Sequence, residues 1–188
     1  MPAARAPRLR LLRIAVAAAV LVAVPVIAWP QPIAAGADEL KAAYLHKFAR
    51  YVEWPDSAFA GADAPIVFGV VGAEAVYAEL ARLLQGPPQP GRAIVAKKLA
   101  PLDPLEGIHV LFVGGAALSA APWQQRVQGR PILLVSDRAQ ALESGAALNF
   151  VLVQNRLRFE ASIVAIEHSG LRVSSRLLAL AQRVVGSP

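Results

Sequence analysis

Three short apolar runs dominate the hydrophobic pattern of the chain. They cover residues 65–72, 108–113 and 131–135, and each is rich in Val, Ile and Leu. Runs of this length without polar alternation are typical of strands buried on both faces of a sheet. A helix is predicted over 75–84 and a further strand over 92–99. Strands separated by helices or loops that cross over the sheet favour a mainly parallel sheet flanked by helices on both sides.

The last third of the chain has a different pattern. Residues 147–153 and 157–163 are predicted strands, and the turn residues 154–156 join them into an antiparallel hairpin. The second strand alternates apolar and polar side chains, as a half-exposed strand at the edge of a sheet does. Short helices are predicted over 163–168 and 174–183. The predicted fold class is therefore α/β, with an antiparallel hairpin at one edge of the sheet.

The segment that begins at Asp38 is predicted to be an amphipathic helix, which Pro55 ends. One face carries apolar side chains at helical spacing: Leu40, Tyr44, Phe48, Tyr51 and Val52. The opposite face is polar, with His46, Arg50 and Glu53. A polar face of this kind is more often a solvated surface than a binding site. Phe48 and, in the later hairpin, Phe150 are predicted members of the hydrophobic core.

A leader segment precedes this helix. Four arginines and no acid stand in the first 13 residues, residues 14–28 form an apolar run interrupted by Pro25, and Ala35-Gly36-Ala37 has the small-residue pattern of a cleavage site. These features predict a secretory signal peptide over 1–37, cleaved near Ala37. A single domain then covers 38–188 and is exported to the periplasm. The alternative is that the segment stays uncleaved as an N-terminal anchor.

Cleavage changes the charge balance of the chain. The whole sequence carries 19 Lys and Arg against 13 Asp and Glu, a net charge of +6, but four arginines lie in the leader. The remaining 15 basic and 13 acidic residues give the mature domain a net charge of +2. Composition therefore gives no support to nucleic-acid binding. The chain has no cysteine, which excludes a thiol nucleophile, a disulfide and a cysteine-based metal site.

Polar residues at the ends of the buried strands do not form a recognisable catalytic motif. Gly114-Gly115 lacks the spacing of a phosphate-binding loop. Ser136 has no nucleophile-elbow motif around it, and Asp137 is predicted to cap a helix that begins at Arg138. The three histidines do not have metal-ligand spacing. We therefore predict a protein that is not an enzyme and that uses no cofactor or metal.

Aromatic and basic residues are the candidates for a binding surface. Tyr51 and Trp54 lie close together, and both residue types anchor protein–protein interfaces, although they also occur in cores. Four arginines gather late in the chain: Arg156, Arg158, Arg172 and Arg176. If the hairpin and the final helix are neighbours, these arginines form a positive patch for an anionic ligand or an acidic partner; otherwise they are solvated. The candidate binding residues are Tyr51, Trp54, Arg156, Arg158 and Arg176.

Three stretches of the mature chain resemble one known family. They are AYLHKFARYVEWP, ILLVSD and LNFVLVQNRLRFEASIVAIEHSGLRVSSRLLALA. The last stretch carries the most specific pattern, N-F-x4-N-R-x-R-F-E followed by G-L-x-[IV]-S-S-x-L-L. The matching positions are Asn149, Phe150, Asn155, Arg156, Arg158, Phe159, Glu160, Gly170, Leu171, Ser174, Ser175, Leu177 and Leu178. On these residues the chain resembles the YfiR-type periplasmic proteins.

The resemblance implies a regulatory function. The best-described members bind the periplasmic region of an inner-membrane diguanylate cyclase and hold it inactive, which lowers cyclic di-GMP and biofilm formation. An outer-membrane lipoprotein can draw the repressor away, and members tend to form homodimers. Their fold is a sheet flanked by helices, in agreement with the fold class predicted above. The chain departs from the best-described repressor in having no cysteine and hence no disulfide.

Two other functions stay open on the sequence alone. One is a periplasmic protein that binds a small ligand in the crevice beyond the carboxyl ends of the strands, at Gly72, Gly114 and Ser136. The other is a hydrolase in which Ser136 is the nucleophile. Convergent polar groups around a closed pocket would favour the small-ligand binder, and an exposed apolar patch would favour the regulatory protein.

Overall fold

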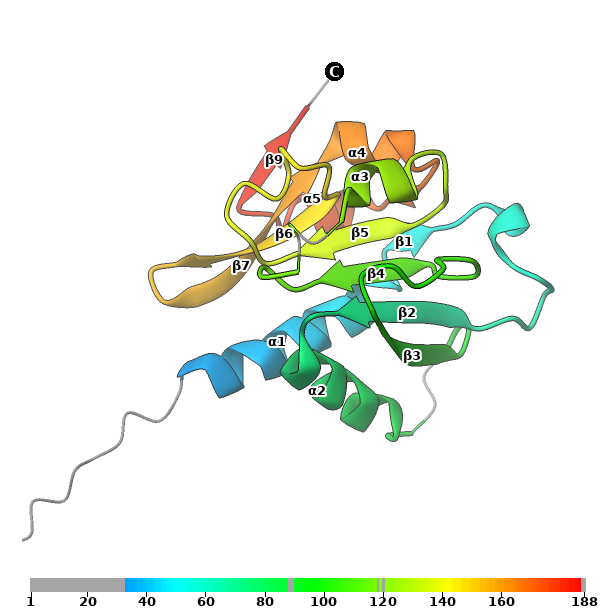
Figure 1. Cartoon of the computed structure of the whole chain (residues 1–188), viewed down its shortest axis with the longest axis horizontal. Helices are drawn as coiled ribbons and strands as arrows, with labels where there is room; N and C mark the ends of the chain where they lie inside the picture. Colours follow the sequence, from blue (N-terminus) through cyan, green and yellow to red (C-terminus); the bar gives the residue numbers. More distant parts are fainter. Residues whose placement is uncertain (1–32, 88–89, 118, 120, 187–188) are drawn as a thin grey trace, which may run out of the picture. The chain divides into compact units, whose positions relative to one another are not determined.

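The computed structural model describes residues 33–87, 90–117, 119 and 121–186. The predicted signal peptide lies outside these residues, apart from 33–37, which belong to the first helix. The described residues form a seven-stranded, mostly parallel sheet with helices on both faces, together with a small two-stranded sheet (Figure 1). The α/β fold class predicted from the hydrophobic pattern is therefore confirmed.

Four parallel strands form one half of the large sheet. They are β2 (Ile66–Val71), β3 (Ile94–Leu99), β4 (Val110–Val113) and β5 (Leu133–Ser136). Every residue of β2, β4 and β5 is buried, as their unbroken apolar runs predict. Exposed and partly buried side chains mostly alternate along β3, because it is the edge strand of the sheet on this side.

The hairpin predicted in the last third of the chain is present. It consists of β6 (Leu148–Val153), which pairs in parallel with β5, and β7 (Arg156–Ser162), which pairs antiparallel with β6. The turn places Gln154 and Asn155 at φ values of 49° and 61°, the left-handed region that tight hairpin turns require. Asn adopts this region more readily than most residues, which gives Asn155 a backbone role.

The edge of the sheet beyond the hairpin differs from the prediction. β7 is not the edge, because β9 (Arg183–Val185) pairs with it in parallel. The helix predicted over 174–183 is correspondingly short: α5 spans Ser175–Leu178, and the backbone N–H of Gln182 then donates to the carbonyl of Phe159 at 2.7 Å. The two valines of β9 favour a strand, and their pairing satisfies backbone groups that an open β7 edge would leave unpaired.

The first helix also differs from the prediction. α1 spans Ile33–Phe48, so it begins before Asp38 and ends well before Pro55. The chain then turns, and β1 (Val52–Glu53) pairs antiparallel with β8 (Arg172–Val173) in the small second sheet. A β-branched residue opens β1, and the residue before a proline avoids helical backbone, so both favour an extended chain here.

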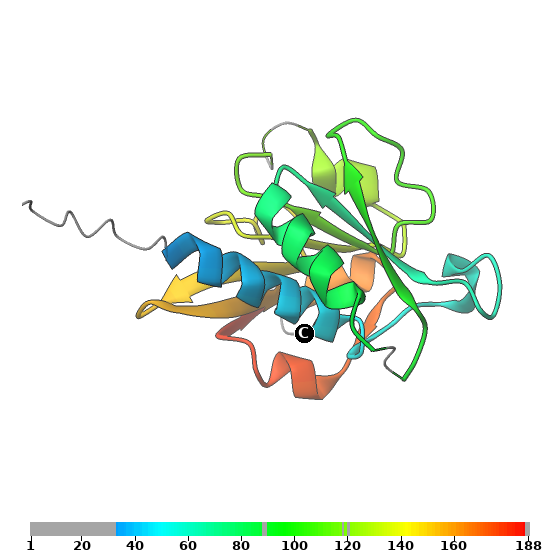
Figure 2. The same ribbon diagram turned by 90° about the horizontal axis from the view of Figure 1, so that it is seen from below.

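The large sheet separates the hydrophobic core into two clusters, and helices cover both faces of the sheet. α1 and α2 (Glu74–Leu84) lie side by side on one face (Figure 2). There Phe48 and Phe150 are 0% and 3% exposed and stack with ring centroids 5.8 Å apart, which confirms both as core residues. The short α3 (Trp123–Val127) packs on the opposite face, and α4 (Ile163–His168) forms where the sequence predicts it. No helix in the described part of the chain is long and apolar enough to span a membrane.

Candidate functional site

A groove of about 690 Å³ runs between α1 and α5, and we call it the α1/α5 groove. Three parts of the chain line it: α1 with the turn that follows it, β7, and α5 with the turn that follows it. The residues that define its floor and walls are Leu40, Tyr44, Lys47, Phe159, Arg176 and Leu180. The groove therefore joins the first helix of the domain to elements more than 100 residues later in the sequence.

The floor of the α1/α5 groove is the outer surface of the first core cluster. Phe48 and Phe159 are 0% and 2% exposed, and their ring centroids lie 5.2 Å apart. The walls, by contrast, expose large apolar side chains: Leu40 on the α1 side is 49% exposed, and Leu180 on the α5 side is 63% exposed. Apolar side chains that stay exposed beside an apolar floor are typical of a contact surface.

Basic side chains surround this apolar surface. Lys47, Arg50 and Arg176 line the groove, and no Asp or Glu is among the described residues that line it. Lys47 and Arg176 form no ion pair with any residue that the structure describes, whereas Arg82 and Arg183 pair with glutamates. The α1/α5 groove therefore combines exposed apolar groups with two cations that are not neutralised within the described fold.

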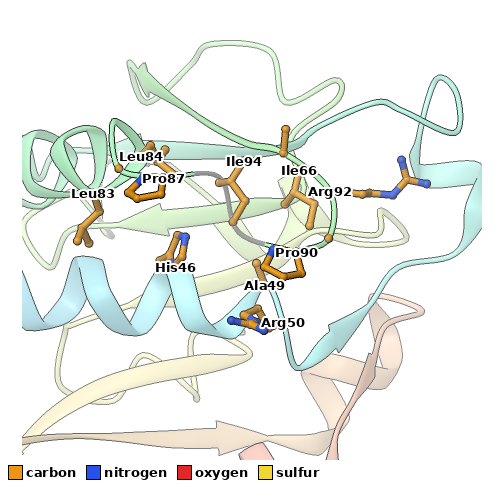
Figure 3. Close-up of a pocket in the computed structure, with 13 residues that line it drawn as sticks. His46, Ala49, Arg50, Ile66, Leu83, Leu84, Pro87, Pro90, Arg92 and Ile94 are labelled. Atoms are coloured by element: carbon orange, nitrogen blue, oxygen red, sulfur yellow. The ribbon is translucent and has the colours of Figure 1, made fainter.

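A second pocket, of about 490 Å³, lies on the other side of α1 (Figure 3). Apolar residues of α2, β2 and β3 line it, and the ring of His46 lies between α1 and Pro87 (Figure 3). Burial and the nearby charge of Arg50 lower the pKa of His46 below its usual range, so the imidazole is mostly neutral at pH 7. Arg92 contributes to the rim, but its side chain turns away and donates to the carbonyl of Ala64 at 2.9 Å. This pocket is therefore less basic than its arginines suggest.

Trp54 belongs to neither cavity, because it packs against the start of β4. Its indole Nε1 donates to the carbonyl of His109 at 3.2 Å, and its ring meets the His109 ring edge-on at 6.3 Å. His109 is 4% exposed; its Nδ1 accepts from the backbone N–H of Val67 and its Nε2 donates to the carbonyl of Ala58, both at 3.0 Å. Phe59 stacks on the imidazole at 4.6 Å. This cluster attaches the segment after β1 to the parallel sheet.

The crevice at the carboxyl ends of the parallel strands is filled by the protein itself. A Cβ atom on Gly114 would lie 2.5 Å from the carbonyl oxygen of Gly72, so no side chain fits between these two loops. Ser136 is fully buried, and its Oγ donates to the carbonyl of Val113 at 2.8 Å. Within the described ranges no group of three His, Asp or Glu residues could hold a metal ion. Ser136 is thus engaged with the backbone, whereas the side-chain amide of Asn149, beside it on β6, is buried with no hydrogen-bond partner among the described residues.

Asp137 closes this crevice, and the prediction that it caps a helix from Arg138 is wrong. Residues 138–145 form turns instead, and Gln140 within them has a φ of 62°, which is incompatible with a continuous helix. The backbone N–H of Gly115 donates to Asp137 Oδ1 at 2.6 Å, and Lys41 Nζ donates to Oδ2 at 2.8 Å and also to Asp38 at 2.9 Å. Burial disfavours the charge on Lys41, but its hydrogen bonds to the two carboxylates outweigh this effect and raise its pKa.

The comparison with known families covers almost the whole described domain. The sequence profile described as YfiR/HmsC-like matches residues 38–182. The chain belongs to the YfiR/HmsC-like family. No curated protein matches the chain at a significant level. Membership of the family supports a general role as a non-catalytic periplasmic regulator of a diguanylate cyclase.

The residues that carry the YfiR/HmsC-like resemblance build one side of the α1/α5 groove. Phe159 supplies part of its floor, and Leu177, 2% exposed, anchors α5 beneath the wall. Ser174 caps α5 by accepting a hydrogen bond from the backbone N–H of Arg176. Asn155 forms the hairpin turn that returns β7 to the sheet. These residues of the motif are thus structural, and the structure they build includes this groove.

The residues predicted for binding fall into two groups. Tyr51 and Arg176 both line the α1/α5 groove. Arg156 and Arg158 are exposed on β7, but side chains alternate along a strand, so they lie on the face opposite the groove-lining Phe159. Together with Trp54, these two arginines lie outside the groove.

Sequence reasoning did not identify Lys47 and Leu180 as members of a site. Lys47 follows Leu40 by seven positions on the same helix face, and this spacing was a signal that could have identified it. Leu180 gives no such signal, because its position depends on the early end of α5 and the return of the chain to β7.

Proposed function

We propose that the protein is a periplasmic repressor that binds the periplasmic region of an inner-membrane diguanylate cyclase and holds it inactive. Membership of the YfiR/HmsC-like family supports the regulation of such a cyclase in general. The observation that carries the finer proposal is the α1/α5 groove, which offers a partner exposed leucines together with Lys47 and Arg176, two cations that form no ion pair with the described residues. It includes Tyr51 and Arg176, and aromatic and arginine side chains contribute most to binding energy at protein interfaces.

Repression sets a thermodynamic requirement on this contact. The protein must bind the inactive state of the cyclase more tightly than the active state, because equal affinity for both states shifts nothing. A change from almost entirely active to almost entirely inactive needs a preference of about 5.5 kcal/mol. A few well-packed anchors reach this scale, since single hot-spot residues contribute about 2 kcal/mol or more. One groove of this kind is therefore sufficient for a repressor.

The proposed pathway begins with export. The signal peptide over 1–37 is cleaved near Ala37, and the mature domain acts in the periplasm as a binding protein, with no catalytic activity or cofactor of its own. Repression lowers cyclic di-GMP and biofilm formation, and an outer-membrane lipoprotein that competes for the domain relieves it. A homodimer is part of this proposal. Trp54, Arg156 and Arg158 stay candidate contacts outside the α1/α5 groove.

Gene deletion tests the repressor function. The deletion strain should contain more cyclic di-GMP and attach more strongly to surfaces. The full chain with its leader should reverse both effects, whereas the same domain retained in the cytoplasm should reverse neither. Unchanged cyclic di-GMP in a deletion strain that does contain a membrane-bound diguanylate cyclase would refute repression.

Mass spectrometry of the periplasmic fraction tests export and cleavage of the signal peptide. The mature protein should begin at or near Asp38. An intact terminus at Met1, recovered with the membrane fraction, would show that the leader is kept as an anchor.

A further inference from the structure

We infer that the α1/α5 groove binds an amphipathic helix of the partner whose apolar face is flanked by acidic residues. The inference rests on the proposed function for the existence of a partner and adds the chemistry that the partner presents. It is carried by three properties of the groove: its length, its exposed apolar walls and the sign of its charges.

The groove has the length and shape that a short helix fills. Leu40, Tyr44 and Lys47 recur at i, i+4 and i+7 along α1, so this wall extends over about two helical turns, or roughly 10 Å. Leu180, after the end of α5, lines the groove on its other side, and the buried Phe159 of β7 lines it as well. A helix in the groove would place its own i, i+3 or i+4, and i+7 side chains against the exposed leucines of the two walls.

The positive charges on both walls of the groove favour acidic residues on the two flanks of that helix. Lys47 stands on the α1 side and Arg176 on the α5 side, and neither has an ionic partner in the part of the chain that the structure describes. Carboxylates on both flanks of the bound helix would therefore find a cation at each wall. Complementary charges accelerate association and reject partners of the same sign. A basic helix with the same apolar face would bring like charges together.

An anionic lipid surface is the other material that combines apolar and acidic groups. Proteins that bind such surfaces present protruding apolar side chains that enter the lipid headgroup region. Here the exposed apolar side chains, Leu40 and Leu180, belong to two different segments that line one groove, and Phe48 and Phe159 between them are at most 2% exposed. A buried floor between two walls fits a rod-like helix better than a flat bilayer.

A synthetic peptide tests the inference before the natural partner is identified. The probe is a fluorescent peptide of roughly 18 residues, about the length at which isolated helices become stable, with leucines at i, i+3, i+4 and i+7 and glutamates on both flanks. It is titrated with mature protein purified from the periplasm, and fluorescence anisotropy reports binding. Leu180→Asp should weaken binding at least tenfold. Leu152→Asp is the matched control, because Leu152 on the hairpin is 62% exposed against 63% for Leu180, and it should bind the peptide as the wild type does.

A charge reversal tests the sign of the partner. Lys47→Glu should weaken binding of the glutamate peptide and strengthen binding of a peptide in which lysines replace the glutamates. Lys97→Glu on β3 makes the same change in net charge outside the groove and should alter neither affinity. Equal effects at positions 47 and 97, or at 180 and 152, would overturn the inference. Binding to phosphatidylglycerol vesicles with no binding of either peptide would overturn it in favour of a membrane surface.

Complementation in cells separates this inference from the repressor function on which it rests. If deletion leaves cyclic di-GMP unchanged, the repressor function fails, and the peptide titration decides the groove alone. If deletion raises cyclic di-GMP and the wild type restores it, Leu180→Asp and Lys47→Glu should not restore it, whereas Leu152→Asp and Lys97→Glu should. Full restoration by both groove variants, exported at wild-type levels, would overturn the groove inference and leave repression intact.

Discussion

Two lysines of α1, less than two turns apart, serve different regions of the molecule. Lys41 faces the crevice at the strand ends, where it contacts Asp38 and Asp137 at 2.9 and 2.8 Å. Lys47 faces the α1/α5 groove and has no ionic partner among the residues that the structure describes. The first lysine therefore holds the helix on the sheet, and the second is available to a partner.

The difference shows that position in a fold does not by itself locate a binding site. Ligands of open α/β sheets usually bind beyond the carboxyl ends of the strands, which is the crevice in this domain. Here Gly114 packs against Gly72, and Asp137 bonds both to Gly115 and to Lys41, so the charged groups of the crevice neutralise one another. In the groove the apolar and charged groups are left exposed. The better guide to contact is which exposed apolar and charged groups lack a partner within the fold.

The largest expected loss of stability comes from the floor of the groove, whose residues belong to the hydrophobic core. Phe48→Ala removes a ring that is 0% exposed and in contact with Phe150 and Phe159, and it should lower the free energy of unfolding by about 3–5 kcal/mol. Urea denaturation of the purified domain measures this loss. If Phe48→Ala unfolds at the same urea concentration as the wild type, the floor is not part of the core and the groove is less rigid than the structure indicates.

A smaller loss is expected in the crevice. Gly114→Ala places a Cβ atom 2.5 Å from the carbonyl oxygen and 3.0 Å from the carbonyl carbon of Gly72, and backbone atoms cannot move aside cheaply. We expect a loss of about 1–3 kcal/mol, typical of an overpacked site. Gly61→Ala is the control, since nothing lies within 4 Å of its added Cβ. Thermal denaturation of both variants measures this loss. A wild-type melting temperature for Gly114→Ala would mean that the crevice is open.

The sequence predicts the parts of the fold that depend on local pattern. The buried strands and the hairpin follow from runs of apolar residues and from turn residues such as Asn155. The errors occur where distant segments meet: the end of α1 depends on the pairing of Val52 with Val173, and β9 forms because the β7 edge is available. The candidate site was likewise predictable only where it depends on residue type and not where it depends on tertiary contacts. Tyr51 and Arg176 are identifiable as residue types, but only tertiary packing places them in one groove.

Acid should act on a third region, around His109, more than on the crevice or the groove. Burial lowers the pKa of His109, the hydrogen bond to Ala58 opposes this shift, and the charge of Arg92 adds to it. The contribution of neutral His109 to stability is complete above the unfolded pKa of about 6.5 and is lost as pH falls toward the folded pKa, because the unfolded chain binds the proton more readily. Protonation also removes the acceptor for the backbone N–H of Val67.

Melting temperatures measured between about pH 5.5 and pH 7.5 test whether protonation of His109 destabilises the fold. The wild type should melt at a lower temperature at about pH 5.5 than at about pH 7.5, and His109→Gln should show a smaller difference between the two. His46 contributes in the same direction, since its pKa is also lowered, so His46→Gln is the necessary companion variant. A wild type that is more stable at the lower pH would contradict the assignment of a neutral His109.

The smallest expected effect is the most direct test of the comparison between the two lysines. Lys41→Met leaves Asp137, with 19% of its side chain exposed, without its cation, and should cost about 1 kcal/mol. Lys47→Met removes no ion pair with a described residue and should change stability by less than about 0.5 kcal/mol. The pKa of Lys41 is raised, so its contribution is complete at neutral pH and is lost only as pH rises through the folded pKa in the alkaline range. The difference in melting temperature between Lys41→Met and the wild type should therefore stay constant from mildly acidic to neutral pH.

Binding of the glutamate peptide should show the reverse order. Lys41→Met should bind it as the wild type does, because its charge is neutralised inside the fold, and Lys47→Met should bind it more weakly despite an unchanged melting temperature. Stability and binding measured on the same two variants thus assign each lysine to one role. If Lys41→Met weakened binding as much as Lys47→Met, the crevice and the groove would form one continuous surface. The structural face of α1 would then not be separate from its contact face.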